Sequence, residues 1–293
     1  MTIDAAKLLE WTFPVTEHAV TVKDAMLYAL GVGLGCEPAD KPELRYVYER
    51  ELAVLPTMAA VIGHPGPWYS DPGTGIDWLR VVHGEQSVEM HAPLRESATL
   101  RCETSVTDIE DKGAGRGALV RWRRRLTDAS DASPVATLDS TLFCRGDGGF
   151  GGPRRAPTAE PDWPAGPPTA TVTRPISPRA ALLYRLSGDL NPVHADPQVA
   201  AEAGFERPIL HGLCTFAMAT WSALRELTGG DATALRSVRA RFKAPVLPGQ
   251  SLRTDLWQDG ATVRFRSYAG DGDGGRLVLD NGLLRLREEG APR

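Results

Sequence analysis

The spacing of apolar residues predicts one long helix and two sets of strands. Between Leu213 and Leu227 apolar side chains recur at helical spacing, and Thr228-Gly229-Gly230 ends that helix. Strict alternation of apolar and polar residues predicts strands. In the second half they are expected at Ser237–Pro245, Gln250–Trp257, Ala261–Ala269 and Arg276–Arg287, and in the first half at Leu79–Met90, Ala98–Ile109, Gly117–Leu126 and Val135–Cys144. Strands that follow helical segments favour an α+β fold with an antiparallel sheet packed on the helix.

A boundary between two halves lies at Gly146–Pro168, which contains six glycines and six prolines. Such a segment cannot hold a regular helix or a central strand. We therefore expect an N-terminal unit over residues 1–150, a linker over 151–170 and a C-terminal unit over 171–293.

The two halves share three weakly similar segments in the same order. The segment AMLYALGVG from Ala25 corresponds to ALLYRLSGD from Ala181, an offset of 156. The segments from Glu51 and Glu206 correspond at 155, and those from Met90 and Phe242 at 152. Each match alone is compatible with chance, and two unrelated domains with similar patterns are the alternative. Their common order favours an internal duplication.

Composition restricts the class of protein. The formal net charge is −4, from 33 basic and 37 acidic residues, which argues against a nucleic-acid-binding protein. No apolar run approaches the roughly 18 residues of a membrane span, and the N-terminus lacks the apolar core of a signal peptide. The four cysteines form no CxxC motif, so free thiols in the cytoplasm are expected.

A glycine pattern, Gly146-x-Gly148-x-x-Gly151, matches the dinucleotide-binding fingerprint as a string. That fingerprint requires a helix directly after it, whose N-terminus binds the pyrophosphate. Here Pro153-Arg154-Arg155-Ala156-Pro157 follows, so nucleotide binding is rejected.

The candidate chemistry lies in Tyr184–His194, where Asp189 and His194 are five residues apart around Asn191-Pro192. Asn-Pro favours a turn, which can bring the carboxylate and the imidazole to one water molecule for general acid–base catalysis. The alternative is purely structural, with Asp196 as the N-cap of a following helix. A metal site is disfavoured because no HExxH motif or second histidine at ligand spacing accompanies the pair.

This stretch resembles the signature of the hydratase 2 (MaoC-like) family, in which Gly-Asp-x-Asn-Pro-x-His carries the catalytic residues. Its fixed positions are here Gly188, Asp189, Asn191, Pro192 and His194, and the resemblance extends to His211-Gly212-Leu213, Arg241–Val246 and Phe143–Gly152. It covers nearly the whole chain. The fold it implies is the double hot-dog, α+β, in which each unit has a long central helix packed on an antiparallel sheet, and a degenerate N-terminal unit precedes an active C-terminal one.

The resemblance implies a hydro-lyase that reversibly converts trans-2-enoyl-CoA to (3R)-3-hydroxyacyl-CoA, in fatty acyl or steroid side-chain metabolism. It implies a homodimer and neither a metal nor a redox cofactor. Asp189 and His194 would hold the water and transfer its protons, and Asn191 would orient it. The backbone N–H of Gly212, at a helix start, would stabilise charge on the thioester oxygen, unless this glycine serves packing alone. Gly188 and His211 would contact the thioester.

The CoA end is expected on the strand Val238–Ala244, where Arg239, Arg241 and Lys243 share one face. Such a face suits phosphates, with Arg241 and Lys243 as the ligands, although a solvated sheet face is the common alternative. Arg121 and Arg123–Arg125 are interpreted as exposed surface.

The first half has lost the catalytic residues. The counterparts of Gly188-Asp189 are Val32-Gly33, and Pro56 replaces the start of the second helix. Gly63–Pro67 should end that helix after about two turns, which leaves space over the sheet. We expect this space to accept a long or bulky acyl group, lined by Leu55, Met58, Val61 and Ile62. Alternatively, Trp68 and Tyr69 fold back and fill it.

The sequence is also compatible with three other functions. One is a dehydratase that acts on 3-hydroxyacyl chains of acyl carrier protein, and another is a non-catalytic acyl-CoA-binding hot-dog protein, against which the intact Asp189, Asn191 and His194 argue. Hot-dog folds also host thioesterases. The acyl group is not specified by the sequence.

Overall fold

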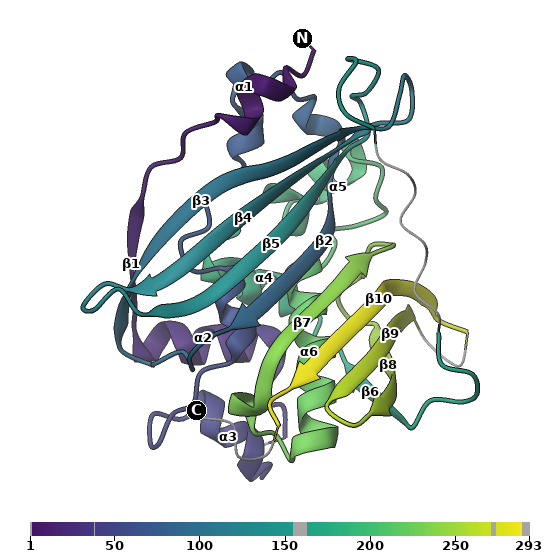
Figure 1. Cartoon of the computed structure of the whole chain (residues 1–293). Coiled ribbons are helices and arrows are strands. Elements are labelled where there is room, and N and C mark those ends of the chain that lie inside the picture. The colour runs from purple at the N-terminus through teal and green to yellow at the C-terminus, as the bar shows by residue number, and fades with distance from the viewer. Residues whose placement is uncertain (1, 38, 155–162, 271–273, 289–293) are drawn as a thin grey trace.

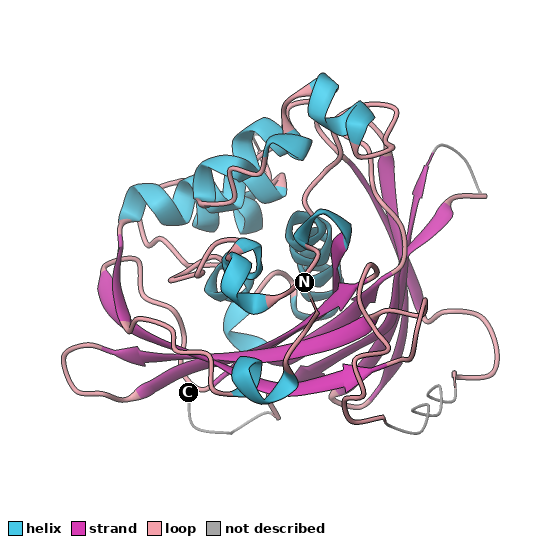
Figure 2. Cartoon of the chain, turned by 90° about the horizontal axis from the view of Figure 1, so that it is seen from above, coloured by secondary structure: helices cyan, strands magenta, loops and turns pink. Residues whose placement is uncertain are grey.

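The computed structural model describes residues 2–37, 39–154, 163–270 and 274–288. A ten-stranded antiparallel sheet curves around the helices, which lie on its concave side (Figures 1 and 2). The strands are β1 (Thr16–Val20), β2 (Val81–Met90), β3 (Ala98–Asp111), β4 (Ala118–Asp128), β5 (Pro134–Cys144), β6 (Ala170–Pro175), β7 (Leu235–Phe242), β8 (Ser251–Asp259), β9 (Thr262–Gly270) and β10 (Arg276–Leu286).

All eight strands predicted from alternation are present, with small differences at their ends. The prediction missed β1 and β6, which are the two edge strands. Both are short, at five and six residues, and each is paired on one side only. Over so few residues, alternation such as that of β6 does not distinguish a strand from a loop.

The strand order repeats between the halves, as the predicted duplication requires. It runs β1-β3-β4-β5-β2 and then β7-β10-β9-β8-β6, so each half places its strands in the same order from its outer edge inward. The halves meet at the antiparallel pair β2–β7, where Ser87 lies opposite Arg239. The result is one continuous sheet with a single concave face.

The helices are α1 (Ala5–Leu9), α2 (Val22–Val32), α3 (Lys41–Val47), α4 (Ala180–Tyr184), α5 (Pro197–Glu202) and α6 (Gly212–Thr228). The predicted long helix is α6, which ends at Gly229 in the left-handed conformation (φ 65°). In the first half the corresponding element is the short 3₁₀ helix Pro56–Ala60 (η1), so the predicted truncation is confirmed. Within the described residues, no helix is long and apolar enough to cross a membrane.

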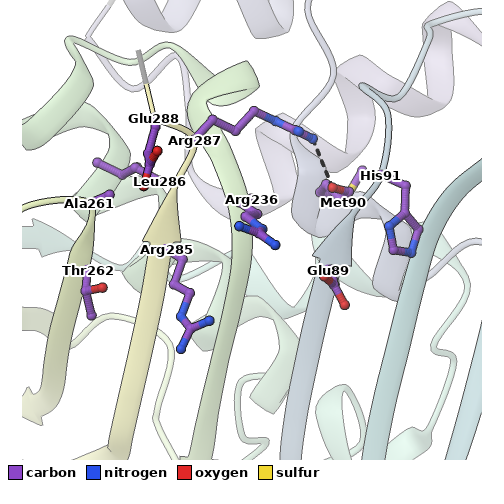
Figure 3. Close-up of a pocket in the computed structure, with 10 residues that line it drawn as sticks. All are labelled: Glu89, Met90, His91, Arg236, Ala261, Thr262, Arg285, Leu286, Arg287 and Glu288. Atoms are coloured by element: carbon purple, nitrogen blue, oxygen red, sulfur yellow. Dashed lines mark hydrogen bonds between the residues drawn. The ribbon is translucent and has the colours of Figure 1, made fainter. Parts of the chain in front are cut away.

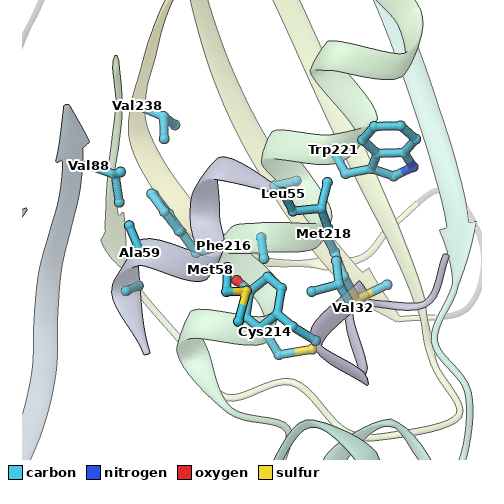
Figure 4. Packing of buried hydrophobic residues seen from close by; sticks show 14 of the residues in the cluster. Val32, Leu55, Met58, Ala59, Val88, Cys214, Phe216, Met218, Trp221 and Val238 are labelled. Atoms are coloured by element: carbon cyan, nitrogen blue, oxygen red, sulfur yellow. The ribbon is translucent and has the colours of Figure 1, made fainter. Parts of the chain in front are cut away.

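One hydrophobic core extends across both halves. Met58 and Val88 of the first half and Phe216 and Val238 of the second belong to the same buried cluster, which lies around α6 (Figure 4). A second cluster around Trp122 covers the outer part of the first half. The two halves therefore bury their apolar surface together.

The interpretation of Arg121 and Arg123–Arg125 as exposed surface is wrong for Arg124, which is 1% exposed. Alternation along β4 turns this side chain inward, where it donates hydrogen bonds to the carbonyl oxygens of Ala60 (2.6 Å) and Ile62 (2.8 Å). The end of a helix leaves such carbonyls without partners. The guanidinium thus caps the truncated helix η1.

Backbone N–H groups of the glycine-rich segment after β5 bind the side-chain carboxylate of Asp111. The Asp111 carboxylate accepts hydrogen bonds from the backbone N–H groups of Gly113 (2.7 Å), Gly149 (2.7 Å) and Gly151 (2.9 Å). No helix follows through Arg154, in agreement with the rejection of a dinucleotide site. Of the linker expected over 151–170, residues 155–162 lie outside the described residues.

Candidate active site

The loop that follows α4 carries Asp189, whose side chain is exposed. Gly188 enters this loop with φ 121°, a conformation that favours glycine. The Asp189 carboxylate accepts a hydrogen bond from the backbone N–H of Asn191 (3.2 Å), and Arg185 donates to the carbonyl of Leu190 (3.0 Å). These contacts stabilise the tight turn that the sequence predicted.

The side-chain oxygen of Asn191 accepts a hydrogen bond from the backbone N–H of Val193 (3.1 Å). Asn191 thereby caps the short 3₁₀ turn Pro192–His194, which places the catalytic candidate His194. Asp196 caps α5 through Gln198 N–H (2.8 Å), which is the structural role considered for this segment.

His194 is buried, and its Nδ1 lies 2.9 Å from the carbonyl oxygen of Ile209. Because a carbonyl only accepts, Nδ1 carries the proton in the neutral ring and Nε2 presents a lone pair. Burial lowers the pKa of His194 below its ordinary value. The ring is therefore neutral near pH 7 and can accept a proton at Nε2.

His211 contacts both catalytic candidates. Its Nε2 lies 3.1 Å from the backbone oxygen of Asp189, and its ring stacks on that of His194 with centroids 3.6 Å apart. Burial also lowers the pKa of His211, and the neighbouring His194 lowers it further. Two neutral imidazoles and one carboxylate thus lie together, although they come from segments about twenty residues apart in sequence.

These three groups are also the only set in the described chain that could hold a metal ion, since their ligand atoms lie within 4.8 Å of one another. The rings of His194 and His211 are inclined by only 26°. Lone pairs in two nearly parallel rings do not converge on one ion, and each ring already has one nitrogen bound to a carbonyl oxygen. The arrangement suits a water molecule better than a cation.

Gly212 begins α6, and no side chain caps this end of the helix. The first N–H groups of a helix lack internal partners and carry the positive end of its dipole. A Cβ atom at Gly212 would lie 3.2 Å from the Phe242 ring. The absence of a side chain at Gly212 therefore leaves space between these N–H groups and Phe242.

His83 of the first half is a site neighbour that the sequence prediction missed. A register shift between His83 and Glu85 changes the alternation of β2, and the His83 ring lies 4.8 Å from that of Phe242. Burial lowers its pKa to about 4. A β-bulge changes the direction in which the following side chains point, but the alternation of residues in the sequence does not reveal where a strand will bulge.

The strand β7 ends at Phe242, so Arg239 and Arg241 lie on it while Lys243, expected on the same strand face, lies just beyond its end. Arg241 forms an ion pair with Glu85 across the β2–β7 junction (2.8 Å), so part of its charge is already compensated. Lys243 is exposed, and no described carboxylate pairs with it. An open cavity of about 580 Å³ lies farther along the same sheet, with Arg236 and Arg285 in its lining (Figure 3).

The expected acyl-chain residues lie in the shared core. Leu55, Met58 and Ile62 are buried, Val61 is partly buried, and η1 contacts α6. Figure 4 shows Met58 beside Cys214 of that helix. Trp68 and Tyr69 belong to the second cluster, where Trp68 packs against Trp122, and not to the core cluster that holds Leu55, Met58 and Ile62.

Two family models match the chain. The MaoC like domain matches residues 161–274, and the MFE-2 hydratase 2 N-terminal domain matches residues 18–146. The chain is 41% identical to 3-hydroxyacyl-thioester dehydratase Y of Mycobacterium tuberculosis, over 94% of this chain and 93% of that protein. It is 39% identical to enoyl-CoA hydratase ChsH3 of the same organism, over 89% of this chain and 91% of that one.

Solved structures show the same architecture. A MaoC-like dehydratase from Phytophthora capsici superposes with a TM-score of 0.84 at 30% identity, over 98% of this chain and 100% of that one. A Mycobacterium tuberculosis protein described as a double hot-dog superposes with a TM-score of 0.58 at 18% identity, over 92% and 93%. The predicted double hot-dog fold is confirmed.

Proposed function

Because the chain belongs to the MaoC-like hydratase 2 family, we propose that its Asp189–His194 site is where water adds to trans-2-enoyl-CoA to give 3-hydroxyacyl-CoA. The reaction is that of a hydro-lyase, and it is reversible. The observation that carries the assignment of this site is the hydrogen bond from His194 Nδ1 to Ile209, which leaves the Nε2 lone pair for a water molecule shared with Asp189.

A water between two acceptors donates one proton to each of them, so its own lone pair is directed at the substrate. The carboxylate of Asp189 and Nε2 of His194 would be these acceptors. As the water oxygen bonds to C3, one of the pair takes a proton from it, and that proton is then delivered to C2 on the same face, which returns the pair to its starting protonation state. Syn addition to one face of the double bond gives the (3R) product, and we propose that the bound substrate presents that face to the pair.

Attack at C3 places negative charge on the thioester oxygen. The N–H of Gly212 at the start of α6 is the group that we propose to stabilise it, because a helix N-terminus offers oriented donors where charge develops. Asn191 acts by fixing the turn that presents Asp189 and His194. Gly188 supplies the backbone conformation of that turn.

The two ends of the substrate would occupy different parts of the fold. We propose that Lys243, assisted by Arg241, binds CoA phosphates at the end of β7. The acyl chain would extend toward η1, where the flexible side chain of Met58 can yield to it. The short η1 supports this proposal, since a full helix would occupy that volume.

The alternative with specific support is the same chemistry in reverse, the dehydration of a 3-hydroxyacyl thioester. A relative at 41% identity is named a 3-hydroxyacyl-thioester dehydratase. One site catalyses both directions of a reversible addition, and the carrier of the thioester, CoA or acyl carrier protein, distinguishes the two physiological roles.

We further propose that residues 1–150 form a degenerate unit joined to a catalytic unit over 171–293, and that the protein is a cytoplasmic homodimer. The four cysteines are free, which supports a reducing compartment.

The decisive experiment follows a panel of enoyl-CoA thioesters by the loss of conjugated thioester absorbance. Hydration of these substrates by the wild type, with (3R)-3-hydroxyacyl-CoA as product, is the expected result. Release of free CoA thiol would instead identify a thioesterase, and binding without turnover would identify an acyl-CoA-binding protein. Acyl-carrier-protein thioesters tested in parallel determine the preferred carrier.

A further inference from the structure

We propose that His211 is a positioning residue that holds the two catalytic residues in place, and that it does not bind the substrate. The inference rests on the proposed function, since it assigns a role within that site. The direct contacts of His211 with Asp189 and His194 carry it.

The first contact fixes the main chain of the catalytic loop. Since the Asp189 carbonyl accepts only, Nε2 of His211 donates the proton in the 3.1 Å hydrogen bond. This bond ties residue 189 to residue 211, at the start of the rigid helix α6. It makes no use of the Asp189 carboxylate, whose one described hydrogen bond comes from the backbone N–H of Asn191.

The second contact fixes the plane of the catalytic imidazole. The His211 and His194 rings stack at 3.6 Å, and Nδ1 of His194 is held by Ile209. A ring with one in-plane hydrogen bond and one covered face cannot rotate freely. Nε2 of His194 therefore keeps one direction, which a proton acceptor needs.

His211 itself is poorly placed to meet a substrate. It is only 1% exposed, and the ring of Tyr184, also 1% exposed, lies 5.0 Å away. Its Nδ1 is buried without a hydrogen-bond partner among the described residues. Burial disfavours a charge on this ring, and protonation would also add a cation beside His194 and near Arg185, so the ring stays neutral.

Three variants separate the two contacts. His211→Gln can keep the donor and loses the ring, His211→Phe keeps the ring and loses the donor, and His211→Ala loses both. We expect kcat for enoyl-CoA hydration to fall in each, by at least roughly ten-fold in the alanine variant, which corresponds to a loss of at least about 1.4 kcal/mol of transition-state stabilisation. KM should change by less than about three-fold, because no substrate contact is removed. A large increase in KM with unchanged kcat would show that His211 binds substrate.

A second measurement is independent of turnover. Nuclear magnetic resonance of the histidine side-chain nitrogens should show His194 protonated at Nδ1 in the wild type, with its signal assigned from His194→Ala. In His211→Ala the His194 ring loses the ring stacked on its face and becomes more exposed. Its pKa should rise toward the ordinary value, and both the Nδ1-protonated and the Nε2-protonated tautomers should be populated. An unchanged pKa and tautomer of His194 in all three variants would overturn the proposal.

If the wild type hydrates no enoyl-CoA, the proposed function fails, and this titration still decides the role of His211. If the alanine variant does not fold, the glutamine and phenylalanine variants decide both measurements.

Discussion

Tyr28 and Tyr184 occupy equivalent positions in the two halves and pack against each other, with ring centroids 5.6 Å apart. Their separation of 156 residues is the offset found by aligning the two helical segments. In the sheet, Ser87 lies opposite Arg239 with the separation of 152 that the strand segments gave. The two pairs mark an approximate two-fold axis between the halves.

This axis identifies which residues of the first half are equivalent to the proposed catalytic residues of the second. The turn that carries Asp189 has as its equivalent the end of α2, where Gly33 caps the helix in the left-handed conformation (φ 94°). Thr57 occupies the position of Gly212 in the truncated helix η1. The first half therefore offers neither a carboxylate nor a long helix N-terminus, and contributes packing around the second site.

Removal of either catalytic group should abolish most of the activity. Asp189→Asn and His194→Ala should each lower kcat for enoyl-CoA hydration by at least about 100-fold, the lower end of acid–base contributions. Asp196→Asn is the matched control, because asparagine caps a helix as well as aspartate does. Circular dichroism checks folding, and near-normal turnover in either catalytic variant would refute the assignment.

The pH dependence follows from the burial of His194. The unprotonated ring is the active form, and burial places its pKa below the ordinary value of about 6.5. Activity should thus persist as pH falls through 6.5 and decline only at lower pH. The measurement is kcat/KM between pH 5 and 8, which reports the free enzyme. The exposed His91 provides a control, since His91→Ala should give the same profile; a midpoint at or above 6.5 would contradict the prediction.

The positive charges of Arg241 and Lys243, at the end of β7, should strengthen binding of the CoA part of the substrate. Arg241→Ala combined with Lys243→Ala should raise KM for CoA substrates and leave kcat nearly unchanged, because uniform binding is removed. Arg236→Ala with Arg285→Ala removes the same charge from the cavity of Figure 3 and serves as the control. If the control pair raises KM and the first pair does not, the CoA phosphates bind at that cavity.

The truncated helix η1 should favour long acyl groups. Medium, long or ring-bearing enoyl-CoAs should be better substrates than crotonyl-CoA, with each buried CH₂ contributing up to roughly 0.8 kcal/mol. Met58→Trp should reduce kcat/KM for long chains selectively, while Met58→Leu, which conserves volume, should not. A preference for crotonyl-CoA that Met58→Trp leaves unaltered would mean that the first half is only scaffold.

Asp111 should stabilise the fold in a pH-dependent way. Hydrogen bonds from the N–H groups of Gly149, Gly113 and Gly151 lower the pKa of this carboxyl group, so its contribution is present above the unfolded value of about 3.9 and is lost as pH falls through the lower folded value. At pH 7 Asp111→Asn should lower the free energy of unfolding by about 1–3 kcal/mol in urea titrations. The exposed Asp259→Asn is the control, and equal stability of the two variants would contradict the prediction.

Several features were determined by the sequence alone, because they depend on residues close together in the chain. Helical spacing located α6, and alternation located β2 to β5 and β7 to β10. The Asn191-Pro192 turn between Asp189 and His194 is equally local, so the catalytic candidates could be named before the fold was known. Membership of the family added what no spacing reveals, the chemistry of the substrate.

Other features were decided only by tertiary structure, because they depend on contacts between distant segments. Strand alternation could not predict that Arg124 turns inward to cap η1, since the carbonyls that it meets lie more than sixty residues away. The β2 bulge that brings His83 to Phe242 depends on pairing with β5. The stacking of His211 on His194 requires the start of α6 to pack against the catalytic loop. A sequence specifies which side chains can react, and long-range packing decides which of them meet and in what orientation.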